Sequence, residues 1–463
     1  MKKLGILFLI GLIGSSAVAF ASGLSIPEQG AAAMGMSAAM TARSQDLSSI
    51  FYNPAGIDYV EKNELFLGLT PIRPSHTYEA DKVSVDSKKQ TFFPPQIYWA
   101  HRVNPRTVIA AGVYSPFGLG TDWGTTWAGR YTSTYAEVQT VYFNPTVTVQ
   151  ATKWLSFGLG YSWVYSSATL ETMMDSGLKI YSATPAAQRN PAVIANTAYD
   201  SKFSLNGEGG GVNWNAGLLL KPTSALQIGA SYRGPTDITY EGQAKFTHQD
   251  FLAAALSPLM PSSQDGTTTL HLPASVNAGI LYRFTEKWDA SFDVNYVRWS
   301  TYDKLVITLD KKLPVEKKTQ IKDWENTTTL RFGTSYIMNE LTVLRGGMLY
   351  DKSPVPDATF DAQLPNNNRL GFSLGFGRKV GVINLDFSYM LLLFSDRDKE
   401  NFVGYTDVTD TFPPGASSKP NGVVNAADRD MLKAMRGGVD YPVGDGTYKS
   451  NANLFSVSAS MKF

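Results

Sequence analysis

The sequence of 463 residues contains no cysteine, so no disulfide can stabilise the folded chain. It has only four histidines, and His76, His101, His248 and His271 are scattered without the spacing of a metal site. We therefore expect no metal ion and no other cofactor.

The sequence also lacks an excess of charge of either sign. Its formal net charge is +1, whereas a nucleic-acid-binding surface normally carries a clear basic excess. We therefore expect no nucleic-acid partner. Beyond the N-terminal segment there is no apolar run near the roughly 20 residues that a transmembrane helix needs. Because 12% of the residues are aromatic and 40 are glycine, the remaining candidates are a soluble β protein and a membrane-spanning β-barrel.

The N-terminus has the pattern of a secretory signal peptide. Lys2 and Lys3 precede an apolar run over residues 4–18, and the A-x-A pattern Ala19-Phe20-Ala21 follows it. The apolar run is shorter than the roughly 20 residues that cross a bilayer, which disfavours the alternative of an uncleaved anchor. We predict a signal peptide over residues 1–21 and an exported mature chain.

Apolar and polar residues alternate with a period of two in many segments. An apolar residue stands at every odd position of residues 155–165 and 455–463, and at every even position of residues 288–296. This alternation is that of a β-strand with one apolar and one polar face. Aromatic residues near the strand ends are typical of membrane barrels, where they form girdles at both interfaces.

The lengths of the connections indicate how the strands are arranged. Every second connection is tight, as at Asn104-Pro105 and Thr152-Lys153, and the others are mostly longer. Outer-membrane barrels have short turns in the periplasm and long loops outside the cell. We predict an all-β fold, a 14-stranded antiparallel transmembrane β-barrel in the outer membrane with both termini in the periplasm. The predicted strands cover residues 63–73, 91–102, 106–116, 135–152, 154–173, 203–221, 224–246, 268–284, 287–309, 317–338, 340–351, 367–379, 381–395 and 453–463.

Residues 22–60 differ in character from the predicted strands. They are rich in Gly, Ala, Met and Ser and poor in the β-branched residues that strands favour. Ala31, Met34, Ala38 and Ala42 fall at helical spacing, which predicts short helices. The apolar content disfavours a disordered periplasmic tail. We predict three parts: the signal peptide over residues 1–21, a lumen plug over residues 22–60, and the barrel over residues 61–463.

Several motifs are similar to those of one protein family. The GLSIPEQG segment over residues 23–30, the Asn53-Pro54-Ala55-Gly56 motif, and the SPFG segment over residues 115–118 followed by Trp123 resemble the FadL/TodX family of outer-membrane transporters for long-chain fatty acids and hydrophobic compounds. The resemblance covers the whole chain up to its terminal Phe463. It implies a monomer in which Phe463 is recognised by the barrel assembly machinery.

The resemblance also implies passive transport of a hydrophobic small molecule. In this family the N-terminal plug is a hatch, which here contains Asn53, Pro54 and Ala55. A kink in the third strand leaves a lateral window toward the outer-membrane lipids. Gly112 or Pro116 is the candidate for this kink, because glycine weakens pairing and proline removes a donor. A simple strand end at Pro116 is the alternative.

Two predicted extracellular loops are rich in large apolar residues. They are Phe251, Leu252, Leu256, Leu259 and Met260 within residues 247–266, and Leu178 and Ile180 within residues 173–201. Exposed apolar side chains mark a binding surface or a contact between loops. We interpret these residues as a ligand-capture surface, with mere packing of the loops as the alternative.

Charged residues stand at positions that the alternation assigns to the lumen, among them Asp289, Asp293, Asp386, Arg331 and Arg345. The favoured interpretation is that they pair with each other across the barrel, since polar residues are ordinary in such a lumen. The alternative is that Arg331 or Arg345 binds a fatty-acid carboxylate, because arginine binds carboxylates in a bidentate manner.

No group of residues indicates catalysis. The G-x-S-x-G pattern at residues 371–375 requires a strand-to-helix turn in a hydrolase, but here it lies inside an alternating strand. We therefore expect a transporter and not an enzyme. A general porin for polar solutes and an outer-membrane hydrolase or adhesin are the alternatives. Fatty acids and aromatic hydrocarbons both stay open as ligands.

Overall fold

The computed structural model describes residues 23–256, 262–310, 317–399 and 444–463. The predicted signal peptide, residues 1–21, lies outside this part of the chain. Among the described residues, none of the helices has the length and apolar character to cross a membrane.

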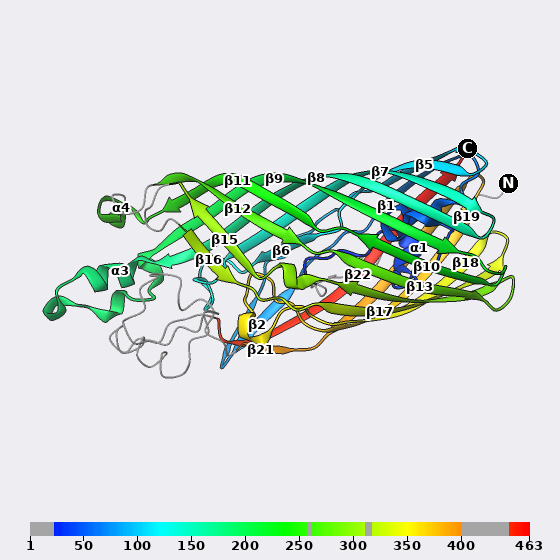
Figure 1. The fold of residues 1–463 in the computed structure, drawn as a ribbon. Coiled ribbons are helices and arrows are strands. Elements are labelled where there is room, and N and C mark those ends of the chain that lie inside the picture. Colours follow the sequence, from blue (N-terminus) through cyan, green and yellow to red (C-terminus); the bar gives the residue numbers. More distant parts are fainter. Residues whose placement is uncertain (1–22, 257–261, 311–316, 400–443) are drawn as a thin grey trace, which may run out of the picture.

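Fourteen antiparallel strands pair in sequence order and close into a barrel (Figure 1), which confirms the predicted fold class. The barrel closes between β1 and β22, where Glu64 and Lys462 are register partners. The strands are β1 (Asn63–Leu69), β4 (Gln96–Asn104), β5 (Thr107–Tyr114), β7 (Tyr135–Thr152), β8 (Leu155–Asp175), β9 (Asp200–Leu220), β10 (Leu226–Arg233), β13 (Ser275–Arg283), β14 (Trp288–Val297), β17 (Thr327–Asn339), β18 (Thr342–Asp351), β19 (Arg369–Val380), β20 (Ile383–Phe394) and β22 (Gly446–Lys462).

Further strands continue this wall beyond the closed ring. They are β2 (His76–Ala80), β3 (Val83–Asp86), β6 (Gly118–Asp122), β11 (Thr236–Thr247), β12 (Ser263–Leu272), β15 (Lys304–Leu309), β16 (Lys317–Ile321) and β21 (Arg397–Lys399). Prolines explain several of the breaks, since proline cannot donate a ladder hydrogen bond. The predicted strand over residues 224–246 is split at Gly234-Pro235, and the strand predicted from residue 91 begins only after Pro94-Pro95.

The two ends of the barrel differ (Figure 1). At one end, the turn end, short turns join neighbouring strands, and the Phe463 amide donates to the Asn63 carbonyl at 3.1 Å. At the other, the loop end, longer connections carry α3 (Ser176–Ala183) and α4 (Asp250–Leu256). Short 3-10 helices occur at Ala186–Gln188, Pro191–Val193, Thr197–Tyr199, Trp299–Thr301 and Asp357–Thr359.

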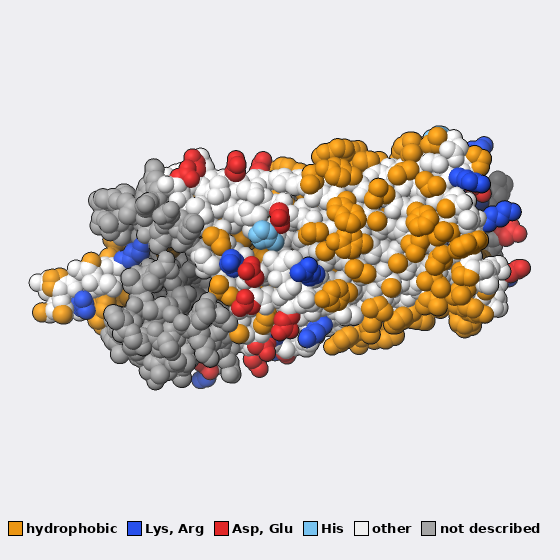
Figure 2. All heavy atoms as spheres, in the orientation of Figure 1, with side chains coloured by type: hydrophobic (Ala, Val, Ile, Leu, Met, Phe, Trp, Pro, Cys, Tyr) orange, Lys and Arg blue, Asp and Glu red, His pale blue; other side chains and the backbone are white. Residues whose placement is uncertain are grey.

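The outer surface carries a broad apolar band near the turn end (Figure 2). On β8, Phe157, Leu159 and Trp163 are about half exposed, whereas Ser156 and Ser162 are buried in the lumen. The predicted alternation is thus apolar outward and polar inward. An apolar surface of this size is stable in lipid, and pairing around the closed ring gives the strands backbone hydrogen-bond partners within the barrel.

Residues 24–60 lie inside the barrel and are nearly all buried. They form α1 (Ala31–Met34), α2 (Ser49–Tyr52) and a 3-10 helix (Pro54–Ile57). The predicted helical run through Ala38 and Ala42 is wrong beyond Met34. Ser37 and Ala38 have φ of 51° and 60°, which ends the right-handed helix and turns the chain back across the lumen. We call residues 23–60 the hatch.

Candidate functional site

The Asn53-Pro54-Ala55 motif forms a buried corner where the hatch meets the barrel wall. The Asn53 carboxamide accepts a hydrogen bond from the Ala55 amide at 3.1 Å and so caps the 3-10 helix. Its Nδ2 donates to the Thr41 carbonyl at 2.7 Å and to the Leu218 carbonyl of β9 at 3.0 Å. One asparagine therefore joins two hatch segments and one barrel strand.

Glycines in the wall make room for this corner. A Cβ at Gly158 of β8 would lie 2.3 Å from the Pro54 carbonyl carbon, and one at Gly217 of β9 would lie 2.0 Å from Asn53 Oδ1. Thr148 of β7 donates to the Pro54 carbonyl at 2.6 Å. The motif is held by close packing against three neighbouring strands.

Buried charges fasten the rest of the hatch to other strands. Arg43 pairs with Asp289 of β14 at 2.7 Å, and Asp58 pairs with Lys221 at 2.7 Å. Asp293 accepts a hydrogen bond from the Thr41 amide at 2.7 Å. Breaking a buried pair on one side is costly because it leaves an unpaired buried charge. The body of the hatch is therefore firmly anchored.

The wall is interrupted at residues 115–117, between β5 and β6. Pro116 lies in this interruption, whereas Gly112 lies inside the regular ladder, with Tyr98 and Asn144 as its register partners. β5 ends at Tyr114, and the chain resumes as β6 at Gly118. The start of the hatch covers the gap, because the Ile26 amide donates to the Pro116 carbonyl at 2.7 Å and the Gly118 amide to the Leu24 carbonyl at 2.9 Å.

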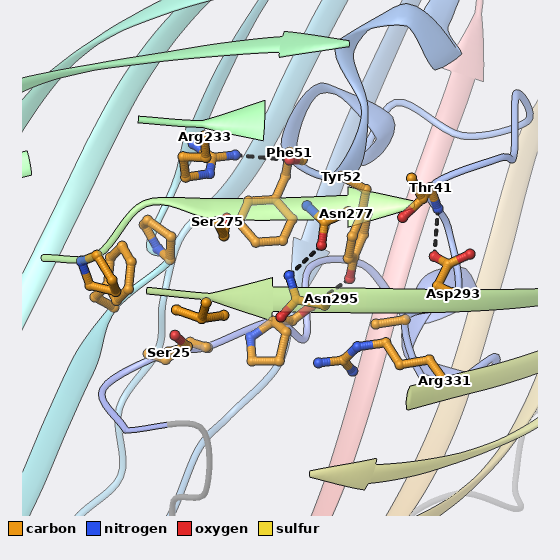
Figure 3. Close-up of a pocket in the computed structure, with 17 residues that line it drawn as sticks. Ser25, Thr41, Phe51, Tyr52, Arg233, Ser275, Asn277, Asp293, Asn295 and Arg331 are labelled. Carbon is orange, nitrogen blue, oxygen red and sulfur yellow. Dashed lines mark hydrogen bonds between the residues drawn. The ribbon is translucent and has the colours of Figure 1, made fainter. Parts of the chain in front are cut away.

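A small inner cavity of about 80 Å³ lies between the hatch and the wall (Figure 3). Its lining includes Phe51, Tyr52, Phe117, Arg233 and Arg331, together with Asn277 and Asn295 on the neighbouring strands β13 and β14. Arg331 and Arg233 approach it from opposite sides in Figure 3. The cavity therefore combines aromatic rings with two guanidinium groups and the carboxylate of Asp293.

The two lining arginines are held differently. Arg233 donates to the Tyr114 hydroxyl at 3.0 Å and to the Phe51 carbonyl at 2.8 Å. Arg331 donates to the Ser37 carbonyl at 3.1 Å, and among the described residues no carboxylate lies within 4.0 Å of its guanidinium. Arg345, the other predicted carboxylate contact, pairs with Asp386 at 2.7 Å and does not line the cavity. Arg233 was not among the residues predicted to contact a carboxylate, although the alternation along β10 points its side chain inward.

A second cavity, the window cavity, has a volume of about 290 Å³ and lies at the wall interruption. Phe93, Pro94, Ser115 and Gly118 contribute to its lining, and Phe93 is 62% exposed on the outer surface. Ile26 lines both cavities. Its side chain thus separates the inner cavity from the opening in the wall.

The predicted capture residues divide between two environments at the loop end. Leu252 of α4 is buried in an apolar cluster with Phe203 and Phe246, and Ile180 of α3 packs against the same cluster. Phe251 is 63% exposed. Leu178 is half-buried on α3, and Leu256 is the last residue of α4. Leu259 and Met260 lie outside the described residues.

Comparison with known proteins gives one consistent result. Residues 12–419 match the model of a family described as outer membrane protein transport protein (OMPP1/FadL/TodX). The chain is 27% identical over 400 residues to a putative outer membrane protein of Neisseria meningitidis, covering 81% of this chain and 86% of that protein. It is 24% identical over 392 residues to the long-chain fatty acid transport protein of Escherichia coli K12, covering 80% of this chain and 85% of that protein.

Solved structures show the same fold. A FadL homologue of Pseudomonas aeruginosa superposes with a TM-score of 0.77 at 16% identity, covering 96% of this chain and 100% of that chain. The toluene transporter TodX of Pseudomonas putida superposes with a TM-score of 0.65 at 16% identity, covering 94% and 98%.

Proposed function

Because this chain belongs to the OMPP1/FadL/TodX family of outer-membrane transport proteins, we propose that it carries long-chain fatty acids passively across the outer membrane. The observation that supports this ligand is the pair of arginines on the inner cavity, Arg331 and Arg233. A guanidinium binds a carboxylate with two parallel hydrogen bonds. A neutral aromatic hydrocarbon has no carboxylate for this bidentate contact and offers a guanidinium only its ring face, although the toluene transporter TodX shares the fold.

The size of the inner cavity requires the hatch to yield. An engineered apolar cavity of about 150 Å³ binds benzene, and the inner cavity is only about half as large, at about 80 Å³. The part that yields is the segment around Ile26, because residues 24–27 carry no charged side chain and form no ion pair. Two backbone hydrogen bonds to Pro116 and Gly118, the hydrogen bond from the Tyr52 hydroxyl to the Pro27 carbonyl, and apolar packing hold this segment. Buried ion pairs at Arg43 and Asp58 hold the hatch body. Displacement of the segment around Ile26 joins the inner cavity to the window cavity. The ligand then leaves laterally into the lipid, near Pro116.

The proposed path begins at the loop end. Phe251 and the cluster of Leu252 and Ile180 offer an apolar surface that collects the ligand. In this proposal the loop end faces the outside of the cell and the turn end faces the periplasm. Both termini of the chain lie on the periplasmic side. In this proposal residues 1–21 are removed as a signal peptide, residues 22–60 are the hatch and residues 61–463 the barrel.

The assembled protein is proposed to act as a monomer. Its last residue, Phe463, is 57% exposed at the end of β22 and available to the barrel assembly machinery before closure. Each strand of the closed ring pairs with two neighbours. A second chain therefore cannot join the ring by strand pairing, which supports a single-chain unit.

The experiment that tests the ligand is uptake of labelled oleate by cells that lack their own transporter and express this chain. We expect saturable uptake. Arg331→Gln should raise the half-saturating concentration roughly 10- to 100-fold, since a charge-assisted hydrogen bond contributes roughly 1.5–3 kcal/mol. Arg298→Gln, on an exposed outer position, is the matched control. No oleate uptake with the barrel present at the surface would overturn the fatty-acid proposal and favour neutral hydrocarbons.

A further inference from the structure

Exposed charges are distributed unequally between the two ends of the barrel. Among the described residues, exposed Lys and Arg at the turn end outnumber exposed Asp and Glu by seven to three. At the loop end the order is reversed, with fourteen exposed acids and eight exposed bases in the described ranges. The exposed turn-end cations besides Lys462 are Lys62, Arg106, Lys153, Lys287, Arg378 and Lys379.

One stretch of this rim combines cations with interfacial aromatic rings. Lys153 adjoins Trp154, which is 51% exposed, and Lys287 adjoins Trp288, which is 46% exposed and stacks on Phe284 at 4.6 Å. The Lys221 amide donates to the Trp154 carbonyl at 2.7 Å, so the turn after β7 and the end of β9 are contiguous. Indole rings beside the apolar band favour the headgroup level of a bilayer.

Arg106 extends this stretch to β5. Its carbonyl accepts a hydrogen bond from the Gln150 amide at 2.8 Å, which places it beside the turn that carries Lys153. From β5 to β14 the exposed charges of the rim are Arg106, Lys153 and Lys287, against the single acid Glu286. A cationic rim at headgroup depth attracts anionic lipid, with about 1 kcal/mol for each Lys or Arg near the surface.

We propose that this rim, from Arg106 to Lys287, binds the phosphates of anionic glycerophospholipids in the leaflet that surrounds the turn end. The occupant is a lipid rather than a protein, because the cations follow the edge of the apolar band and alternate with exposed indoles. The binding site is distinct from the ligand cavities, and only its assignment to the periplasmic leaflet rests on the proposed orientation of the chain.

The test uses the full-length protein in detergent with equal amounts of dioleoyl phosphatidylglycerol and dioleoyl phosphatidylcholine. Native mass spectrometry then counts the lipids that stay bound. We expect phosphatidylglycerol to be retained preferentially, and retention to fall when salt screens the charges. The triple variant R106Q/K153Q/K287Q should lower that preference by up to about fivefold per cation.

The control variant R298Q/K304Q/K352Q removes as many cations from the loop end. It should keep the preference for phosphatidylglycerol. Equal retention of both lipids by the native protein, or an equal loss in both triple variants, would overturn the proposed rim. The orientation of the chain is measured separately, by labelling the variant Asn339→Cys in intact cells. Labelling from outside the cell would overturn the assignment of the rim to the periplasmic leaflet. Oleate uptake does not depend on the lipid-retention result or on the labelling result.

Discussion

Replacing Gly158 by alanine is expected to unseat the hatch while the barrel stays closed. The added carbon would lie 2.3 Å from the Pro54 carbonyl carbon and 2.4 Å from the Ala55 nitrogen, both on the hatch backbone. Overpacking costs about 1–3 kcal/mol. Displacement of the Pro54 backbone also breaks its hydrogen bond with Thr148, which costs about 1 kcal/mol more. The total cost of about 2–4 kcal/mol would lower the ratio of molecules with a seated hatch to molecules with a displaced hatch by roughly 30- to 700-fold.

Conductance of single proteins in planar bilayers measures this displacement. The native barrel should stay closed most of the time, and Gly158→Ala should open frequently. Gly346→Ala is the matched control, because a Cβ there meets nothing closer than 3.8 Å. Heat-modifiable gel mobility checks that both variants form barrels. A closed Gly158→Ala channel, or a barrel lost in this variant alone, would refute the reasoning, since the clash would then not act on the hatch.

Three further predictions concern the proposed path. Ser25 and Phe117 form an isolated antiparallel bridge. A disulfide between the cysteines of the double variant S25C/F117C should therefore stop oleate uptake until reductant is added. Uptake by the oxidised form would contradict movement of this segment. Phe251→Ser should raise the half-saturating oleate concentration severalfold at an unchanged maximal rate, whereas identical uptake curves would favour mere loop packing. Deletion of residues 24–50 should leave a heat-modifiable barrel that admits large antibiotics, because the ring of strand pairs is complete without the hatch; absence of the folded band would count against an independent barrel.

The sequence was sufficient for the barrel because strand formation depends on local pattern. Alternation of Phe157, Leu159 and Trp163 with small polar residues determines which face meets lipid, and the alternation of tight and long connections determines the antiparallel order. The inward parity of Arg331 follows from the same rule. Arg233 obeys it too, next to Gly234-Pro235, and could have been found by extending the pattern to every strand end.

Other features were not predictable because they depend on contacts between distant segments. No local pattern distinguishes Arg331, which lines the inner cavity, from Arg345, which Asp386 of another strand neutralises. Gly112 and Pro116 were equal candidates for the kink, and the difference lies in the ladder partners that only Gly112 has.

The sequence by itself determined the barrel, its strand order and its lipid-facing surface, because a period of two and the turn lengths are local properties of the chain. Only the tertiary structure placed Ile26 between the two cavities and fitted Asn53-Pro54-Ala55 against Gly158 and Gly217. The contacts of Pro54 with Gly158 and of Asn53 with Gly217 join residues more than one hundred positions apart, and closure of the ring around the hatch brings them together. Their geometry therefore depends on the closed barrel and not on any segment alone.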